Sequence, residues 1–118
     1  MRVLIVEDEA IIALDLSELM REFGVEVVGV AGAEDEAVML AIELRPDVIL
    51  MDIRLRNFPF DNWDGVKAAA RIQHHYSPKI VYVTALVNPE TAARIWSSIV
   101  VTKPFTRESL RRVIFDVD

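Results

Sequence analysis

Acidic residues follow two segments of this sequence that have the character of buried strands. The run Val48–Met51 is apolar without alternation, which is typical of a strand covered on both faces, and Asp52 comes directly after it. A similar run over 2–6 is followed by Glu7 and Asp8. Because ligands of open α/β sheets bind at the carboxyl ends of the strands, these three carboxylates are candidates for a ligand site.

Taken alone, Asp52 fits a cap for the next segment equally well. Two more residues at strand ends favour a site: Thr84 follows the apolar run 79–83, and Lys103 follows the run 99–102. If the first and third strands are neighbours, the carboxylates, this hydroxyl and this ammonium share one edge of the sheet. Oxygen ligands without His or Cys favour a hard ion such as Mg²⁺, and a hydroxyl with an ammonium suits a tetrahedral anion. The pattern predicts phosphoryl transfer onto or through a carboxylate.

Strands and helices alternate along the chain and must position these residues. Alternation of this kind predicts a parallel sheet with right-handed crossovers and helices on both faces, a doubly wound α/β fold. The expected strands cover 2–6, 25–30, 48–51, 79–83 and 99–102. The expected helices cover 9–23, 33–44, 65–76, 88–97 and 106–117.

Local signals predict where the helices begin and end. Gly24 should end the first helix, because glycine is favoured just after a helix C-cap. Arg45 should end the second, because a residue before proline disfavours helical backbone. Thr106 should cap the last helix. The buried face of the third helix is predicted to consist of Val66, Ala69, Ala70 and Gln73.

Length and composition exclude several classes of protein. A chain of 118 residues corresponds to one domain, 1–118. A net charge of −6 argues against nucleic-acid binding, since the one dense basic group, Arg107, Arg111 and Arg112, is typical of a solvated helix face. The lack of cysteine excludes disulfides and thiol chemistry. No apolar run reaches membrane-spanning length, so a soluble, cytoplasmic protein is predicted.

These motifs together are specific enough to indicate a family. Over nearly its whole length the chain resembles the receiver domain of two-component response regulators, which includes chemotaxis regulators. The resemblance implies a five-stranded sheet of order 2-1-3-4-5 with five helices, a flavodoxin-like three-layer sandwich. The residues that carry it are Glu7-Asp8, Met51-Asp52, Asp64-Gly65, Thr84-Ala85 and Lys103-Pro104-Phe105.

The resemblance implies roles for the acidic residues. Asp52 matches the phosphoacceptor, which takes a phosphoryl group from a sensor histidine kinase or a histidine phosphotransfer protein. Asp8 matches a direct Mg²⁺ ligand, and Glu7 matches the acid that holds the ion through water. The backbone carbonyl of Arg54 matches a further ligand.

The resemblance also implies roles for the other strand-end residues. Thr84 matches the hydroxyl that moves to the phosphoryl group on activation, and Ala85 matches the small residue that leaves room and offers its N–H. Lys103 matches the lysine that pairs with the phosphoryl group, and its bond to Pro104 is usually cis in the family. The resulting change of conformation would control a downstream protein target or an output domain.

The chain departs from the family pattern in three places. The segment between Asp52 and Gly65 is longer than usual. The stretch from Thr84 to Lys103 is shorter, and Val100 stands where the family commonly has Tyr or Phe. The last two departures bear on the conformational switch and not on the phosphorylation site. The long segment carries aromatic residues that either cover the third helix or dock a partner: Phe58, Phe60 and Trp63.

Two alternatives have their own sequence marks. A receiver-like interaction module that is never phosphorylated would lack the acceptor, an acid or the lysine, and all of these are present. A flavin or small-molecule enzyme on this architecture would need a Gly-rich phosphate loop after the first strand, where Glu7 and Asp8 stand instead. The cognate kinase, the output, the oligomeric state, including a homodimer, and any continuation past Asp118 stay open.

Overall fold

The computed structural model describes residues 1–53, 64–85 and 98–115. The helix expected over 88–97 and the end of the last helix lie outside these ranges. The elements that the described residues form are β1 (Arg2–Val6), α1 (Ala10–Glu22), β2 (Glu26–Ala31), α2 (Glu34–Leu44), β3 (Val48–Met51), α3 (Asp64–Gln73), β4 (Lys79–Thr84), β5 (Ile99–Thr102) and α5 (Arg107–Phe115).

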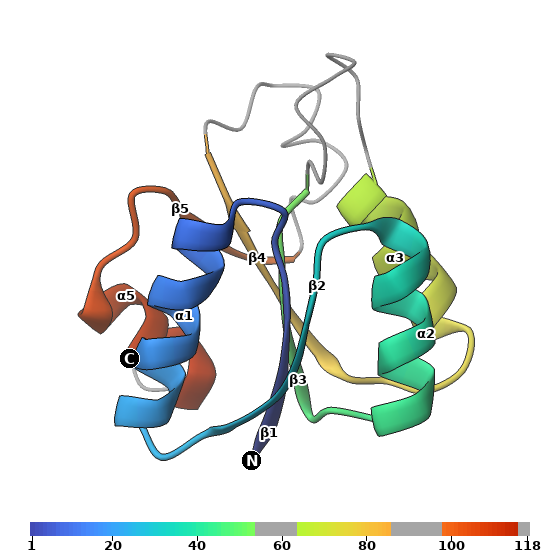
Figure 1. Ribbon diagram of the computed structural model, residues 1–118, viewed down its shortest axis with the longest axis horizontal. Coiled ribbons are helices and arrows are strands. Elements are labelled where there is room, and N and C mark those ends of the chain that lie inside the picture. Colours follow the sequence, from blue (N-terminus) through green and yellow to red (C-terminus); the bar gives the residue numbers. More distant parts are fainter. Residues whose placement is uncertain (54–63, 86–97, 116–118) are drawn as a thin grey trace.

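The five strands form one sheet in the order β2-β1-β3-β4-β5, and all four pairings are parallel. Figure 1 shows three layers, with α1 and α5 on one face of the sheet and α2 and α3 on the other. This doubly wound α/β architecture confirms the predicted fold class and strand order. It also makes β1 and β3 neighbours, which is the condition for their carboxyl ends to share a site.

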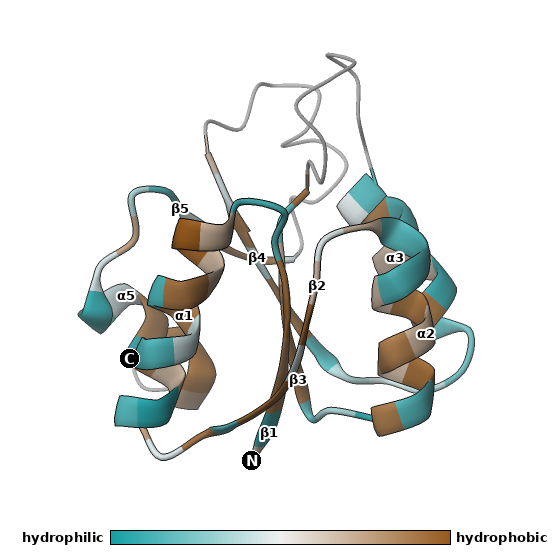
Figure 2. Ribbon diagram, in the orientation of Figure 1, coloured by the Kyte–Doolittle hydropathy of each residue, from teal (hydrophilic) through white to brown (hydrophobic). Residues whose placement is uncertain are grey.

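The unbroken apolar runs of β1 and β3 are explained by their place at the centre of the sheet. From Val3 to Val6, no residue is more than 1% exposed, and β3 is similarly buried. Alternate residues of these strands contribute to two core clusters, one against α1 and α5 and the other against α2 and α3. In Figure 2 the central strands are hydrophobic, while the helices combine hydrophobic and hydrophilic residues.

The helix boundaries follow the predicted signals. Gly24 after α1 has φ of +79°, a left-handed conformation that glycine adopts without strain. Helix α2 ends at Arg45, which is itself left-handed, with φ of 47° and ψ of 60°, rather than extended as is common before proline. The carbonyl groups of Leu44 and Arg45 accept hydrogen bonds from the Arg2 guanidinium, at 2.6 and 3.4 Å. None of the described helices is long and apolar enough to cross a membrane.

Helix α5 begins at the predicted cap. The hydroxyl of Thr106 accepts a hydrogen bond from the Ser109 N–H at 3.0 Å. Arg111 and Arg112 lie on the solvated side and pair with Glu108 at 3.2 and 3.4 Å. The third arginine of the basic group pairs with an acidic residue of α1. The group is therefore a solvated helix face, as predicted.

The buried face of α3 differs from the prediction. Ala70 and Gln73 are exposed, and Val66 is only half-buried. The observed buried set has the same helical spacing as the predicted one but is displaced by one residue, because three consecutive alanines fit either of two neighbouring helix faces. In the observed orientation, Gly65 in the first turn of α3 lies against the backbone of Asp52 and Ile53, just after β3. The side chains and glycine that α3 buries are Asp64, Gly65, Ala68, Ala69 and Ile72.

Candidate functional site

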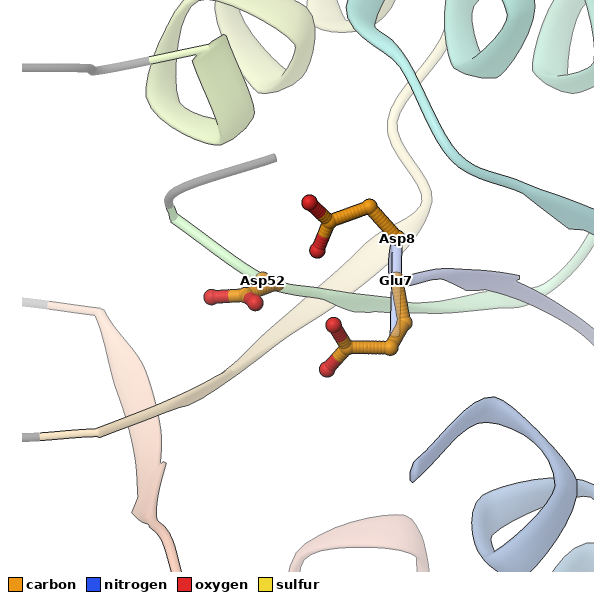
Figure 3. Close-up of side chains that lie close together, drawn as sticks. All are labelled: Glu7, Asp8 and Asp52. Atoms are coloured by element: carbon orange, nitrogen blue, oxygen red, sulfur yellow. The ribbon is translucent and has the colours of Figure 1, made fainter. Parts of the chain in front are cut away.

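Three carboxylates converge at the carboxyl ends of β1 and β3. Val6 pairs with Met51, and the Asp52 N–H continues the ladder by donating to the Val6 carbonyl at 2.9 Å. Glu7 and Asp8 consequently lie beside Asp52. Each of the three offers a carboxylate oxygen, and these oxygens all lie within 4.8 Å of one another. Figure 3 shows the three carboxylates around a common space.

The acids differ in burial and therefore in electrostatics. Glu7 and Asp52 are buried, at 3% and 7% exposure, whereas Asp8 lies at the surface. Partial desolvation raises the pKa of the Asp8 carboxyl, and the hydrogen bond and negative charge of Glu7 raise it further. A raised pKa means that ionised Asp8 is disfavoured when only the neighbouring acids surround it. A bound cation would reverse that preference.

Lys103 places an ammonium among these acids. Its Nζ donates to Oε1 of Glu7 at 2.6 Å and to Oδ2 of Asp52 at 3.1 Å, and its side chain is 14% exposed. Burial lowers the pKa of Lys103, but the hydrogen bond to Glu7 and the charge of Asp52 outweigh it, so the pKa is raised. The lysine is thus held in its charged form.

Backbone contacts at the ends of β4 and β5 place the lysine. The Lys103 N–H donates to the Thr84 carbonyl at 2.6 Å, directly after the register pair of Thr84 and Thr102. The Lys103-Pro104 peptide bond is cis, as the resemblance implied. Thr84 is 6% exposed at the end of β4, and Ala85 follows it at the surface. The predicted hydroxyl and small residue therefore lie at the same edge of the sheet as the acids.

Glu7 is held at both of its carboxylate oxygens. While Oε1 binds Lys103, Oε2 accepts a hydrogen bond from the Glu9 N–H at 3.2 Å, just before α1 begins. Both oxygens already have protein partners, and direct coordination of an ion would displace one of them. Glu7 is therefore better suited to hold an ion through water. This pairing of Glu7 with Lys103 was not predicted, since sequence places both residues at strand ends without saying which atoms meet.

Several predicted features lie outside the described residues. They include Arg54, whose carbonyl the resemblance assigns to the metal, and the aromatic residues Phe58, Phe60 and Trp63. Most of the shortened stretch before β5 lies outside as well. Val100 of β5 is described: it is half-buried, packs against the cluster beneath α2 and α3, and pairs in register with Tyr82.

Gly65 is one of the residues that carry the resemblance, but sequence reasoning assigned it no role at the site. Its N–H donates to the carbonyl of Ile53 at 2.8 Å, so the start of α3 is bonded to the residue after Asp52. The signal in the sequence was a glycine near the start of a helix, where most other residues have a higher helix propensity. Such a glycine indicates that another segment packs closely against the helix, but it does not identify that segment.

The donor set suits a hard divalent cation. Three carboxylates and one ammonium leave a formal charge of −2, and the candidate ligand atoms are all oxygens. Mg²⁺ commonly takes one or two carboxylates and completes its shell with water and phosphate oxygens. The acidic triad could therefore hold a metal ion, with the lysine beside it to meet an anion.

A doubly wound parallel sheet with an acidic cluster after its first and third strands and a lysine after its fifth defines a phosphoacceptor signalling domain. The response regulator receiver domain family matches residues 3–115, so the chain belongs to this family. Its class is two-component signalling, in which a receiver works with a histidine kinase. The acidic cluster of Glu7, Asp8 and Asp52 is consistent with the family's phosphorylation site.

Individual relatives agree with this membership. The chain is 42% identical over 93 residues to the transcriptional regulatory protein PdtaR of Mycobacterium tuberculosis, covering 79% of this chain and 43% of that protein. It is 35% identical over 116 residues to the phyllosphere-induced regulator PhyR of Methylorubrum extorquens, covering 95% of this chain and 41% of that protein. The chain thus spans less than half the length of these two relatives.

A solved structure shows the same likeness. The signal receiver domain of a modulated diguanylate cyclase from Desulfovibrio desulfuricans superposes with a TM-score of 0.84 at 34% sequence identity. The match covers 98% of this chain and 91% of that one. The likeness extends over the whole fold and is not confined to the sheet.

Proposed function

We propose that Asp52 accepts a phosphoryl group and that residues 1–118 act as one receiver domain in a phosphorelay. The observation that carries the proposal is the position of Asp52: its carboxylate lies within 4.8 Å of those of Glu7 and Asp8 and 3.1 Å from the Lys103 ammonium. A bound cation and the Lys103 ammonium would both attract the negative oxygens of a phosphoryl group. Because Asp52 lies between these two positive charges, its carboxylate can approach the phosphorus with less repulsion.

The proposed reaction forms one bond and breaks one. A carboxylate oxygen of Asp52 attacks the phosphorus of a phosphohistidine. The P–N bond to the imidazole breaks, and its electron pair stays on the nitrogen. The products are an aspartyl phosphate and a histidine that regains its proton from water. With a small acyl phosphate as donor, a P–O bond breaks instead.

The residues of this chain have separate tasks in the transfer. Lys103 balances the charge of the phosphoryl oxygens while remaining close to the Asp52 carboxylate. Asp8 and Asp52, with the Arg54 carbonyl, would hold Mg²⁺, and Glu7 would hold it through water. When bound, Mg²⁺ neutralises the converging carboxylates and phosphoryl oxygens. Thr84 and Ala85 would contact the phosphoryl group afterwards.

The proposal extends to partners and surroundings. The donor would be a sensor histidine kinase or a histidine phosphotransfer protein, and the phosphorylated form would act on a protein target or an output domain. Direct nucleic-acid contact by this domain is not expected at a net charge of −6. We place the reaction in the cytoplasm, away from the membrane, and a homodimer would be compatible with it.

Phosphorylation with a small donor tests the proposal. The purified protein, incubated with Mg²⁺ and acetyl phosphate, should gain the mass of one phosphoryl group, and alkali should release it. Asp52→Asn should gain none. Asp47→Asn is the matched control, since Asp47 is an acidic residue just before β3, at the opposite end of that strand from Asp52.

The labelling pattern separates the alternatives. A label that persists in Asp52→Asn would assign the acceptor to another residue. A wild-type protein that binds Mg²⁺ but takes no label from either acetyl phosphate or a phosphohistidine donor would instead be a receiver-like interaction module.

A further inference from the structure

The first turn of α3 lies against the backbone that carries Asp52. Gly65 is the second residue of this helix. A Cβ atom at Gly65 would lie 2.7 Å from Ile53 Cα and 2.8 Å from the Asp52 carbonyl carbon, and closer still to the Asp52 carbonyl oxygen. All three are backbone atoms, which cannot rotate away as the end of a side chain can. Any residue other than glycine would therefore force the helix and the Asp52–Ile53 backbone apart.

Two hydrogen bonds limit how that backbone can move. The Asp52 N–H is bonded to the Val6 carbonyl at 2.9 Å, and the Ile53 carbonyl is bonded to the Gly65 N–H at 2.8 Å. Ile53 is also 2% exposed, so its side chain is fixed in the core. A shift of the Asp52 carbonyl would turn the peptide between these anchors and move the carboxylate relative to the other acids.

We propose that Gly65 is a positioning residue for phosphoryl transfer: it lets α3 pack directly on the Asp52 peptide and so fixes the Asp52 carboxylate relative to Asp8 and Lys103. This inference rests on the proposed function. Gly65 does not touch the phosphoryl group; it acts through Asp52.

The same contact explains how the domain tolerates a long segment beside its site. Residues 54–63 lie between Ile53 and Asp64, and the hydrogen bond from the Gly65 N–H to the Ile53 carbonyl joins the described residues on either side of them. The spacing between Asp52 and α3 is therefore set by this bond and by the glycine, and not by the number of residues in between.

Substitution of Gly65 tests the proposal. Gly65→Ala should lower the maximal rate of phosphorylation by acetyl phosphate at least tenfold and weaken Mg²⁺ binding at least threefold, because the Asp52 carboxylate is displaced. Gly65→Ser should behave alike, since it introduces the same Cβ. Rates and Mg²⁺ affinities are measured at a temperature at which circular dichroism shows each variant folded.

Ala68→Gly is the matched control. Ala68 lies on the buried face of the same helix, so its replacement by glycine destabilises α3 without adding an atom near Asp52. This control should lose stability and keep the wild-type rate and Mg²⁺ affinity. A folded Gly65→Ala with a lower melting temperature but unchanged rate and affinity would overturn the proposal and leave Gly65 a purely structural role.

Hydrogen exchange on the wild type covers the case in which Gly65→Ala does not fold. The first N–H groups of a helix have no partner within the helix and normally exchange quickly. The proposal requires the Gly65 N–H to exchange as slowly as the N–H groups of β3; exchange at the rate of a frayed helix end would refute it. If the wild type takes no phosphoryl group, the proposed function fails, while Mg²⁺ affinity and exchange still test the geometry.

Discussion

Glu7 and Lys103, which are 96 positions apart in the chain, form a 2.6 Å ion pair at the carboxyl edge of the sheet. The Glu7 side chain is 1% exposed, and its two carboxylate oxygens accept hydrogen bonds from this partner and from the Glu9 N–H. The same ammonium reaches Asp52. Lys103 thus joins the end of β5 to the ends of β1 and β3 before any phosphoryl group is present.

Replacing Lys103 should destabilise the protein and the effect should depend on Mg²⁺. Lys103→Met leaves three neighbouring carboxylates without the ammonium, and loss of one partner from a mostly buried ion pair should lower the free energy of unfolding by about 2 kcal/mol at neutral pH. Because Mg²⁺ would supply positive charge at the same place, it should stabilise the variant more than the wild type. Urea unfolding with EDTA and with Mg²⁺ measures both effects.

Lys67→Met is the control for the lost charge, because Lys67 is an exposed residue of α3. It should change stability by less than about 0.5 kcal/mol. If Lys103→Met were as stable as Lys67→Met in EDTA, the ammonium would not be holding the acids together.

Asp8→Asn should have opposite effects without and with metal. In the wild type the pKa of Asp8 is raised by partial burial and by Glu7, so ionised Asp8 is disfavoured in the folded protein. The neutral amide of the variant should therefore stabilise the protein slightly in EDTA. With Mg²⁺ the order should reverse. The wild type gains about 2.7 kcal/mol at a metal concentration one hundred times its Kd, and a variant with at least tenfold weaker binding gains much less.

The pH dependence of this difference has a definite sign. A raised folded pKa means that the Asp8 contribution to stability is lost as pH rises and recovered as pH falls through that pKa. In EDTA the advantage of Asp8→Asn should therefore be largest near neutral pH and shrink in acid. A metal-dependent gain equal in wild type and Asp8→Asn would show that Asp8 is not a ligand.

The central strands and the meeting of the acids could be predicted from strong local signals, whereas the strand order was implied by the resemblance to the receiver family. Two unbroken apolar runs demanded central strands, and the acids after them had to share an edge once those strands were adjacent. The roles of Thr84, Ala85 and Arg54 stay predictions, since they concern a bound phosphoryl group or metal. Phe58, Phe60 and Trp63 also stay predictions, because they lie outside the described residues.

The features that could not be predicted depend on tertiary packing. The predicted rotation of α3 was wrong by one residue, because three consecutive alanines fit either of two neighbouring helix faces. Likewise, Glu7 could be placed at a strand end but its pairing with Lys103 could not, since that requires the side-chain directions at the ends of two non-adjacent strands. The contact of Gly65 with the Asp52 backbone could not be predicted either, because it depends on how α3 packs against the end of β3.

Tyr82 should make the protein sensitive to alkali. The residue is 6% exposed in the cluster beneath α2 and α3, and burial raises the pKa of its hydroxyl above the ordinary value of 10.0. A group with a raised pKa contributes stability that is intact below its unfolded pKa and is lost as pH rises through the folded one. Each unit of difference corresponds to about 1.4 kcal/mol.

The measurement is urea unfolding of wild type and Tyr82→Phe on both sides of pH 10.0. The stability of wild type relative to the variant should fall across that range. Tyr76 is half-buried, and burial raises the pKa of its hydroxyl as well, so Tyr76→Phe should show a change of the same sign. Parallel alkaline curves for wild type and Tyr82→Phe would contradict the burial argument.

Thr84→Val should separate phosphorylation from the response to it. The contact of Thr84 with Lys103 runs through its backbone carbonyl, and valine keeps both that carbonyl and the branched shape of the side chain. We therefore expect Mg²⁺ affinity and the labelling rate to stay within about threefold of wild type. We expect phosphorylation to raise the melting temperature of the wild type, because the phosphoryl group gains contacts at the site. The variant lacks the hydroxyl that the resemblance assigns to the phosphoryl group, so this rise should shrink by more than half.

The matched control is Thr102→Val, because Thr102 is the exposed register partner of Thr84 on β5 and carries the same substitution one strand away. It should respond to phosphorylation as the wild type does. If Thr84→Val instead slowed labelling as strongly as Lys103→Met, its hydroxyl would serve the transfer itself. If both valine variants kept the full melting-temperature response, the response would not depend on a threonine hydroxyl, and the described contacts of Lys103 and of the Asp52 peptide would be the next ones to test.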